Sequence, residues 1–309
     1  MLKNVEIICF QACYLLVFVL ECVRLAFARK NKWLAVAANV MAIAGCVAHG
    51  AFLYYNDLLQ NDHFFAKVSS WFILFAFVLT LISLYLSAVY RRTRFHLFFM
   101  PAAIVLIVVA LKAGNATFAR EGTANCIQAT HGAALAIAAS LYFFGALNGA
   151  LFRLQRKRLK NPTSNASLPL PTIEWLNKST RLAVNSATLA LGVGVLSGYY
   201  LRSFTASQNE AQLDPVAIGA TVLFILALVE RFTGEFLSKR RLDACVRDSR
   251  LALIVFIILC VLLYLAAFTR NGHFRKLTID ANSAYNAQSE FITALCAESP
   301  PPWRDKSCF

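Results

Sequence analysis

Long apolar stretches alternate with short polar segments along most of the chain. A helix needs about 20 apolar residues to cross a bilayer, and it satisfies its backbone polar groups internally, as any segment in lipid must. The pattern therefore predicts an all-α fold, a polytopic membrane helix bundle with about eight transmembrane helices. The predicted spans are 5–27, 33–55, 68–90, 97–114, 130–152, 182–201, 215–236 and 251–269.

The composition supports the same class of protein. Hydrophobic residues make up 59% of the chain and charged residues 15%, whereas soluble domains average about 45–50% and about 25%. The first apolar stretch lacks a basic leader and a small-residue cleavage site, so we interpret it as a span and not as a signal peptide. We expect the bundle over 1–270 and an extracytoplasmic C-terminal tail over 271–309.

The basic residues predict the orientation of the spans. The segments after the first, third, fifth and seventh spans are rich in Lys and Arg, and the 153–181 segment alone holds seven of them. Such segments face the cytoplasm. Both termini are then outside, which in a bacterium means the periplasmic side of the cytoplasmic (inner) membrane. The net charge of +14 reflects this asymmetry, so we expect contact with anionic lipid headgroups and not with nucleic acid.

Histidines supply the clearest candidate chemistry. Of the five in the chain, three are expected near the outer face: His49 within the second span, His131 at the start of the fifth, and His273 after the eighth. Imidazole is an axial ligand of haem iron and also binds zinc or copper. Two such residues on different helices could hold a haem edge-on among apolar side chains.

A purely structural interpretation stands beside this one. Polar residues at the ends of spans can simply hydrogen-bond to neighbouring helices. We interpret His63 and His96 as ordinary loop residues. His49 is the deepest of the five, and an ionisable residue inside the membrane is a functional candidate by default.

Small and charged residues predict how the helices pack. Gly145 with Gly149, and Gly194 with Gly198, have the four-residue spacing that lets transmembrane helices approach closely. Close packing of this kind could position His131. Glu21 and Arg24 are spaced to pair on one helix face. Glu230 and Arg231 could snorkel or pair in the same way.

The order of these features from the fifth span onward resembles the cytochrome c assembly protein family, in its small HemX-like branch of eight-span proteins. The matching features are a His opening a small-residue span, a basic run, a Leu-Pro-Thr-Ile-Glu segment and a Gly-rich span. They lie at 131–136, 156–160, 170–174 and 191–198. His49 and Pro101 also fall at family positions, so the resemblance covers roughly 33–274.

The resemblance implies haem handling at the outer face of the membrane. By it, His131 and His273 flank the haem iron, His49 is a candidate intramembrane ligand, and another cytochrome c assembly subunit is a partner. One departure concerns the loop that binds haem in larger members, which is Trp-rich and ends in Trp-Asp-Pro. Here 207–215 keeps the Asp-Pro but has no tryptophan. This favours an accessory protein that holds or delivers haem over a self-sufficient enzyme.

Two other functions remain open: a membrane regulator of haem synthesis that acts by protein contact through its basic segments, and a small-molecule transporter without haem. Enzymatic motifs such as Gly-x-Ser-x-Gly, a Walker loop or His-Glu-x-x-His are absent from the sequence. So is Cys-x-x-Cys-His, hence the chain is not itself a c-type cytochrome. Cys296 and Cys308 could form a disulfide in an oxidising periplasm.

Overall fold

A computed structural model describes residues 7–26, 32–58, 68–90, 93–113, 125–160, 170–205, 215–237 and 245–262. Almost all of these residues are helical, which confirms the predicted all-α class. The helices are α1 (Ile7–Ala26), α2 (Lys32–Phe52), α3 (Val68–Val89), α4 (His96–Ala113), α5 (Asn125–Lys160), α6 (Ile173–Thr205), α7 (Pro215–Leu237) and a last helix over 245–262. A π-helical turn, η2 (Leu53–Leu58), follows α2 directly.

Among the described residues, five helical stretches are long and apolar enough to cross a membrane: Ile7–Ala26, Trp33–Tyr55, Ser69–Val89, Ala129–Lys160 and Ile173–Tyr200. The apolar stretch His96–Lys112 of α4 is shorter. Large apolar side chains also point outward from these helices, as at Val47, Leu189 and Leu196, which are 61%, 74% and 69% exposed. Apolar surface of this extent fits a lipid environment, so the chain has the helices of a multi-span membrane protein.

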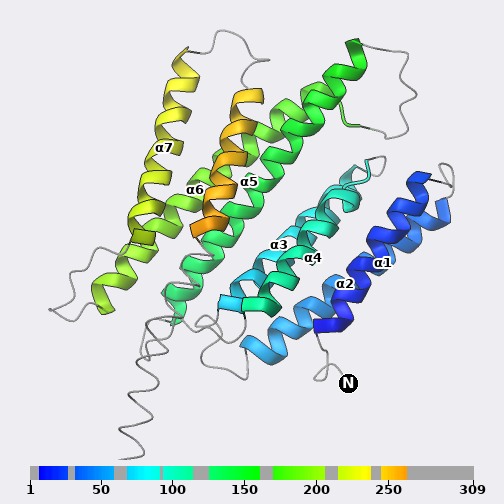
Figure 1. Cartoon of the computed structure of the whole chain (residues 1–309), viewed down its shortest axis with the longest axis horizontal. Helices are drawn as coiled ribbons and strands as arrows, with labels where there is room; N and C mark the ends of the chain where they lie inside the picture. Colours follow the sequence, from blue (N-terminus) through cyan, green and yellow to red (C-terminus); the bar gives the residue numbers. More distant parts are fainter. Residues whose placement is uncertain are drawn as a thin grey trace, which may run out of the picture. The chain divides into compact units, whose positions relative to one another are not determined.

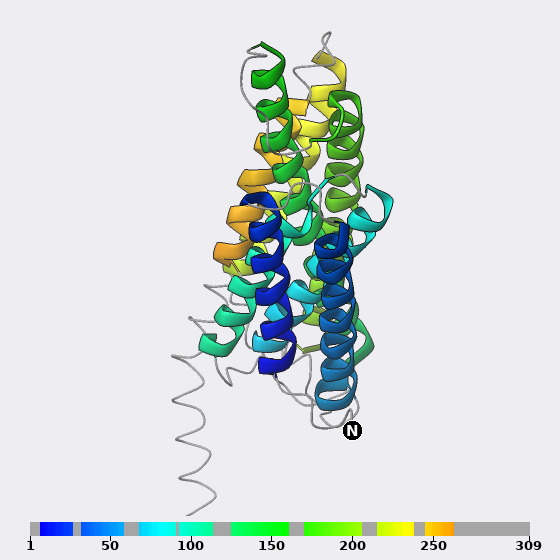
Figure 2. The same ribbon diagram turned by 90° about the vertical axis from the view of Figure 1, so that its right-hand side faces the viewer.

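The helices pack mainly as antiparallel neighbours. Extensive contacts join α1 to α2, α3 to α4 and α5 to α6, and further contacts join α1 to α4, α2 to α3, α3 to α5 and α6 to α7. Figures 1 and 2 show these pairs, with α3 and α4 between the α1–α2 pair and the α5–α6 pair. Aromatic residues fill much of the shared core; Phe99, for example, has its ring centroid 5.6 Å from that of Phe143.

Two helices are longer than the sequence predicted. The 153–181 segment was expected to be a polar loop, but α5 continues to Lys160 and α6 begins at Ile173. With 36 residues, α5 is about 54 Å long, against about 30 Å for the hydrocarbon core of a bilayer. The prediction was wrong because a fall in hydropathy marks the edge of the lipid and not the end of a helix. Leu, Gln, Lys and Arg are all good helix formers.

Local interactions explain where α6 begins. The side-chain oxygen of Thr172 accepts a hydrogen bond from the backbone N–H of Trp175 at 3.3 Å, which caps the helix. Glu174 lies in the first turn, where a negative charge complements the helix dipole. The indole N–H of Trp175 donates to the hydroxyl of Tyr90, next to the end of α3. The Leu-Pro-Thr-Ile-Glu segment is therefore the start of a helix.

Candidate functional site

His131 lies in the second turn of α5 and faces α6. Its Nδ1 is 2.7 Å from the backbone carbonyl oxygen of Gly194 and 3.4 Å from the hydroxyl oxygen of Ser197. A carbonyl oxygen can only accept a hydrogen bond, so Nδ1 carries the hydrogen and donates a hydrogen bond to the Gly194 carbonyl. Nε2 is then the nitrogen with the free lone pair. The ring is held across the helix interface in one tautomer and one orientation.

The two glycines of α6 make this arrangement possible. A Cβ atom at Gly198 would lie 2.9 Å from Cε1 of His131, and one at Gly194 would lie 2.7 Å from Cδ2 of Leu135. Both distances are shorter than van der Waals contact. The predicted close approach of α5 and α6 is confirmed, and so is the expectation that it positions His131.

A tryptophan lies beside His131. A Cβ atom at Gly132, the next residue, would fall 1.5 Å from Cζ3 of Trp71, so the indole ring of α3 covers the backbone of α5 at this point. Trp71 is not among the residues predicted from the sequence. The sequence feature that could have indicated this contact is Gly132, next to the candidate ligand His131. A large ring can approach a backbone closely only where there is no side chain.

His49 is fully buried between α1, α2 and α3. Its ring stacks on Phe10 with centroids 4.1 Å apart and an interplanar angle of 7°, and Phe77 lies edge-on at 5.2 Å. Nδ1 is 3.0 Å from the hydroxyl oxygen of Tyr14. Nε2 is buried and has no partner in hydrogen-bond geometry, although the backbone carbonyl of Ile73 also interacts with the ring.

His96 is not the loop residue that the sequence suggested. It is the first residue of α4, is 2% exposed, and both of its ring nitrogens are hydrogen-bonded. Nδ1 is 2.8 Å from the hydroxyl oxygen of Ser83, and Nε2 is 3.0 Å from Oδ1 of Asn39. The loop prediction rested on the basic residues around His96, which indicate a position at the membrane interface. It was wrong because polar partners on α2 and α3 allow the imidazole to be buried.

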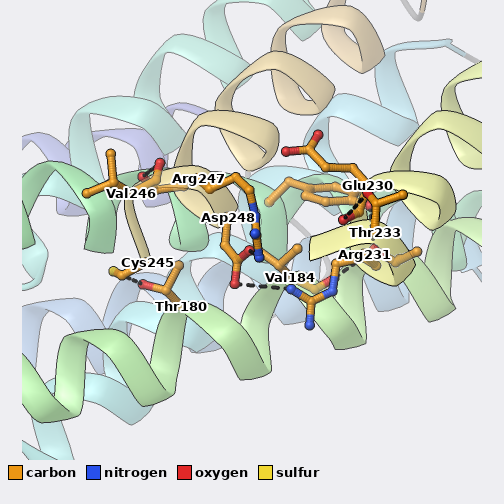
Figure 3. A network of polar contacts seen from close by, with 12 residues as sticks. Thr180, Val184, Glu230, Arg231, Thr233, Cys245, Val246, Arg247 and Asp248 are labelled. Atoms are coloured by element: carbon orange, nitrogen blue, oxygen red, sulfur yellow. Dashed lines mark hydrogen bonds and ion pairs between the residues drawn. The ribbon is translucent and has the colours of Figure 1, made fainter. Parts of the chain in front are cut away.

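Charged residues form a second buried group, which joins α7 to the last helix. Oδ2 of Asp248 is 3.1 Å from Nη1 of Arg231, and Oδ1 is 3.5 Å from Nη2 of Arg247. Figure 3 shows the Asp248 carboxylate turned toward the Arg231 guanidinium, with Cys245 and Thr180 close by. The sequence suggested that Glu230 and Arg231 snorkel or pair; the structure shows an ion pair between Arg231 and Asp248, which the sequence did not predict. The expected Glu21–Arg24 pair is confirmed at 2.9 Å.

Several predicted residues lie outside the described part of the chain. These are His63, His273, Cys296 and Cys308, together with the whole 271–309 tail. Within the described helices, no three His, Cys, Asp or Glu side chains come together as ligands of a metal ion. His131 and His49 lie at different helix interfaces. His131 contacts α6, whereas His49 lies between α1, α2 and α3. The two interfaces are connected through α3, which contacts both α2 and α5.

Comparisons with known proteins identify no relative. No family model, no curated protein and no solved structure matches the chain. The resemblance to the cytochrome c assembly family therefore stays a prediction.

Proposed function

We propose that the chain is an integral membrane haem-handling accessory protein, which holds or delivers haem at the outer face of the membrane. His131 is the axial ligand. The observation that carries this proposal is the hydrogen bond from its Nδ1 to the Gly194 carbonyl. Histidines that bind metals usually donate their second ring nitrogen in this way, which fixes the tautomer and raises the basicity of the ligating nitrogen.

His131 is partly exposed, and small and aromatic residues surround it. The ring is half-buried, glycines lie against it on α6, and the Trp71 indole covers the adjacent backbone. His273 completes the ligand pair in this proposal. His49 is left out of it, because Phe10, Tyr14 and Phe77 already enclose its ring. Haem, when bound, would supply the iron centre, and the protein would supply its orientation and a dry environment.

The membrane arrangement is part of the same proposal. Eight helices cross a bacterial inner membrane, both termini are periplasmic, and the basic end of α5 faces the cytoplasm. A second cytochrome c assembly subunit receives or supplies the haem. The charge asymmetry along the sequence supports this orientation.

An absorption spectrum tests the ligand directly. Wild-type protein purified in detergent from haem-replete cells is expected to show a Soret band, and His131→Ala is expected to lose most of it. Ser197→Ala is the matched control on α6, because its hydroxyl lies 3.4 Å from Nδ1 and is not the main partner. Wild-type protein without a Soret band would contradict the proposal.

A substitution that leaves the ligand in place tests how it is positioned. In Gly198→Ala the new methyl group would fall 2.9 Å from Cε1 of His131, so the ring must turn and lose its bond to Gly194. We expect weaker haem retention, by about tenfold or more, since one well-oriented outer-shell hydrogen bond affects metal affinity by about 10–100-fold. The measurement is haem retained during dialysis against apomyoglobin. Retention equal to the wild type would show that the ring is not held by α6.

One observation favours a second candidate function. On the extension of α5, the exposed side chains Arg153, Arg156, Lys157 and Lys160 recur at a spacing that places them on one helix face. A basic helical face beyond the membrane suits contact with an acidic protein, as in a membrane regulator of haem synthesis. If the wild-type protein carries no haem, this is the function that the structure supports next.

A further inference from the structure

A line of polar side chains, all but one of them buried, runs through α1–α4, separate from the His131 site. It consists of residues from four helices: His49 and Asn39 on α2, Tyr14 on α1, Thr80 and Ser83 on α3, and His96 on α4. His49, Tyr14, Thr80 and Ser83 are 0% exposed, and His96 is 2% exposed. Polar groups at this depth are costly unless they are used in packing or function.

The first half of the line is a chain of hydrogen bonds. The hydroxyl oxygen of Tyr14 lies 3.0 Å from Nδ1 of His49 and 3.3 Å from the hydroxyl oxygen of Thr80. Thr80 donates in turn to the backbone carbonyl of Phe77 at 2.8 Å, so it accepts from Tyr14. Tyr14 connects an imidazole on one helix to a hydroxyl on another.

The second half has the same character. The hydroxyl oxygen of Ser83 lies 2.8 Å from Nδ1 of His96, and Nε2 of His96 lies 3.0 Å from Oδ1 of Asn39. Asn39 is exposed, so this end of the line reaches the surface of the bundle. Arg24, on α1, is close enough to interact electrostatically with His96.

One helical turn separates the two halves. Thr80 and Ser83 stand three residues apart on α3, where side chains lie on the same face about 5–6 Å from each other. A single water molecule bridges two polar groups at such a separation. A hydroxyl and a neutral imidazole each have one donor and at least one acceptor position. Thr80 passes a proton on when its hydroxyl turns away from the Phe77 carbonyl toward Ser83.

The line extends over about half of the apolar layer. From His49 to Asn39 is ten residues of α2, or about 15 Å along the helix, about half of the hydrocarbon thickness. Its far end is Nε2 of His49, a fully buried nitrogen without a partner in hydrogen-bond geometry, although the backbone carbonyl of Ile73 also interacts with this ring. A relay needs such an atom at the point where water or another proton carrier joins it.

We propose that α1–α4 hold a proton path, in which a proton taken up at Nε2 of His49 passes through Tyr14, Thr80, one water molecule and Ser83 to His96, whose Nε2 releases it beside Asn39. This activity is separate from haem handling, because none of these side chains belongs to the His131 site. The alternative is that the same hydrogen bonds only fasten the helices together.

The α5–α6 pair offers a matched control for the decisive experiment. Tyr142 is as buried as Tyr14, and its hydroxyl lies 2.9 Å from that of Thr188, but this Tyr–Thr pair does not belong to the proposed path. The protein is reconstituted in liposomes with pyranine inside, and a potassium diffusion potential is imposed with valinomycin. We expect proton uptake above that of empty liposomes, at least tenfold slower in Tyr14→Phe and unchanged in Tyr142→Phe.

A second pair of variants protects the test against misfolding. Ser83→Ala removes the hydroxyl next to His96, whereas Ser140→Ala removes an equally buried hydroxyl that bonds only its own helix at Ala136. Ser83→Ala is expected to slow uptake and Ser140→Ala is not. Wild-type uptake equal to empty liposomes, or equal rates in Ser83→Ala and Ser140→Ala, would overturn the proposal. The Soret band reports the haem proposal separately and should be the same in all four variants.

Discussion

Replacing Asp248 with alanine is expected to destabilise the protein by about 3–5 kcal/mol, because it removes one partner of a largely buried ion pair with Arg231. The Asp248 side chain is 5% exposed and that of Arg231 is 12% exposed. Their N–O distance is 3.1 Å, and Arg247 adds a second contact at 3.5 Å. Water screens this group little, unlike a surface ion pair, which contributes only about 0–1 kcal/mol.

The measurement is reversible unfolding in mixed micelles, followed by circular dichroism. Glu174→Ala is the control: this exposed carboxylate interacts with the α6 dipole and contributes about 0.3–1 kcal/mol. The double variant Arg231→Met/Asp248→Leu should recover much of the lost stability, since apolar replacement of a buried pair is often nearly neutral. If Asp248→Ala proves no worse than Glu174→Ala, the pair does not hold α7 to the last helix.

The sequence predicted the positions of the helices more accurately than it predicted their ends. Hydropathy located α1 and α3 almost to the residue, because these helices are no longer than the apolar layer they cross. It failed for α5, whose last turns carry Arg156, Lys157 and Lys160. Outside the lipid, the charged side chains of these turns carry no desolvation penalty, and the turns keep their backbone hydrogen bonds. The helix therefore continues where the apolar pattern stops.

The candidate site was predictable in its parts but not in its pairing. A His at the start of a span and two glycines at a four-residue spacing are visible in the sequence. The bond between His131 and Gly194 depends on the register of α5 against α6, which no local pattern encodes. The same holds for His96, whose partners Ser83 and Asn39 come from two other helices.

Interfaces built on glycine also predict where the bundle is most easily broken, and Gly149 is the strongest case. A Cβ atom at this position of α5 would lie 1.9 Å from Cβ of Ser249 in the last helix. The position of a Cβ is fixed by the backbone, so no rotamer relieves the overlap. Gly149→Ala must push the last helix away from α5, and we expect a loss of about 1–3 kcal/mol, the range for overpacked cores.

Cys245 gives a local readout of this displacement, because it lies on the same helix and is 1% exposed. Gly149→Ala should raise the rate at which a maleimide modifies Cys245, followed by peptide mass spectrometry. Gly50→Ala is the matched control, since the nearest atom to a Cβ there is 3.5 Å away on Phe77. Adding Ser249→Gly to Gly149→Ala removes the clashing Cβ and should restore slow modification. Without that rescue, the close approach of the two helices would not be what holds the last helix in place.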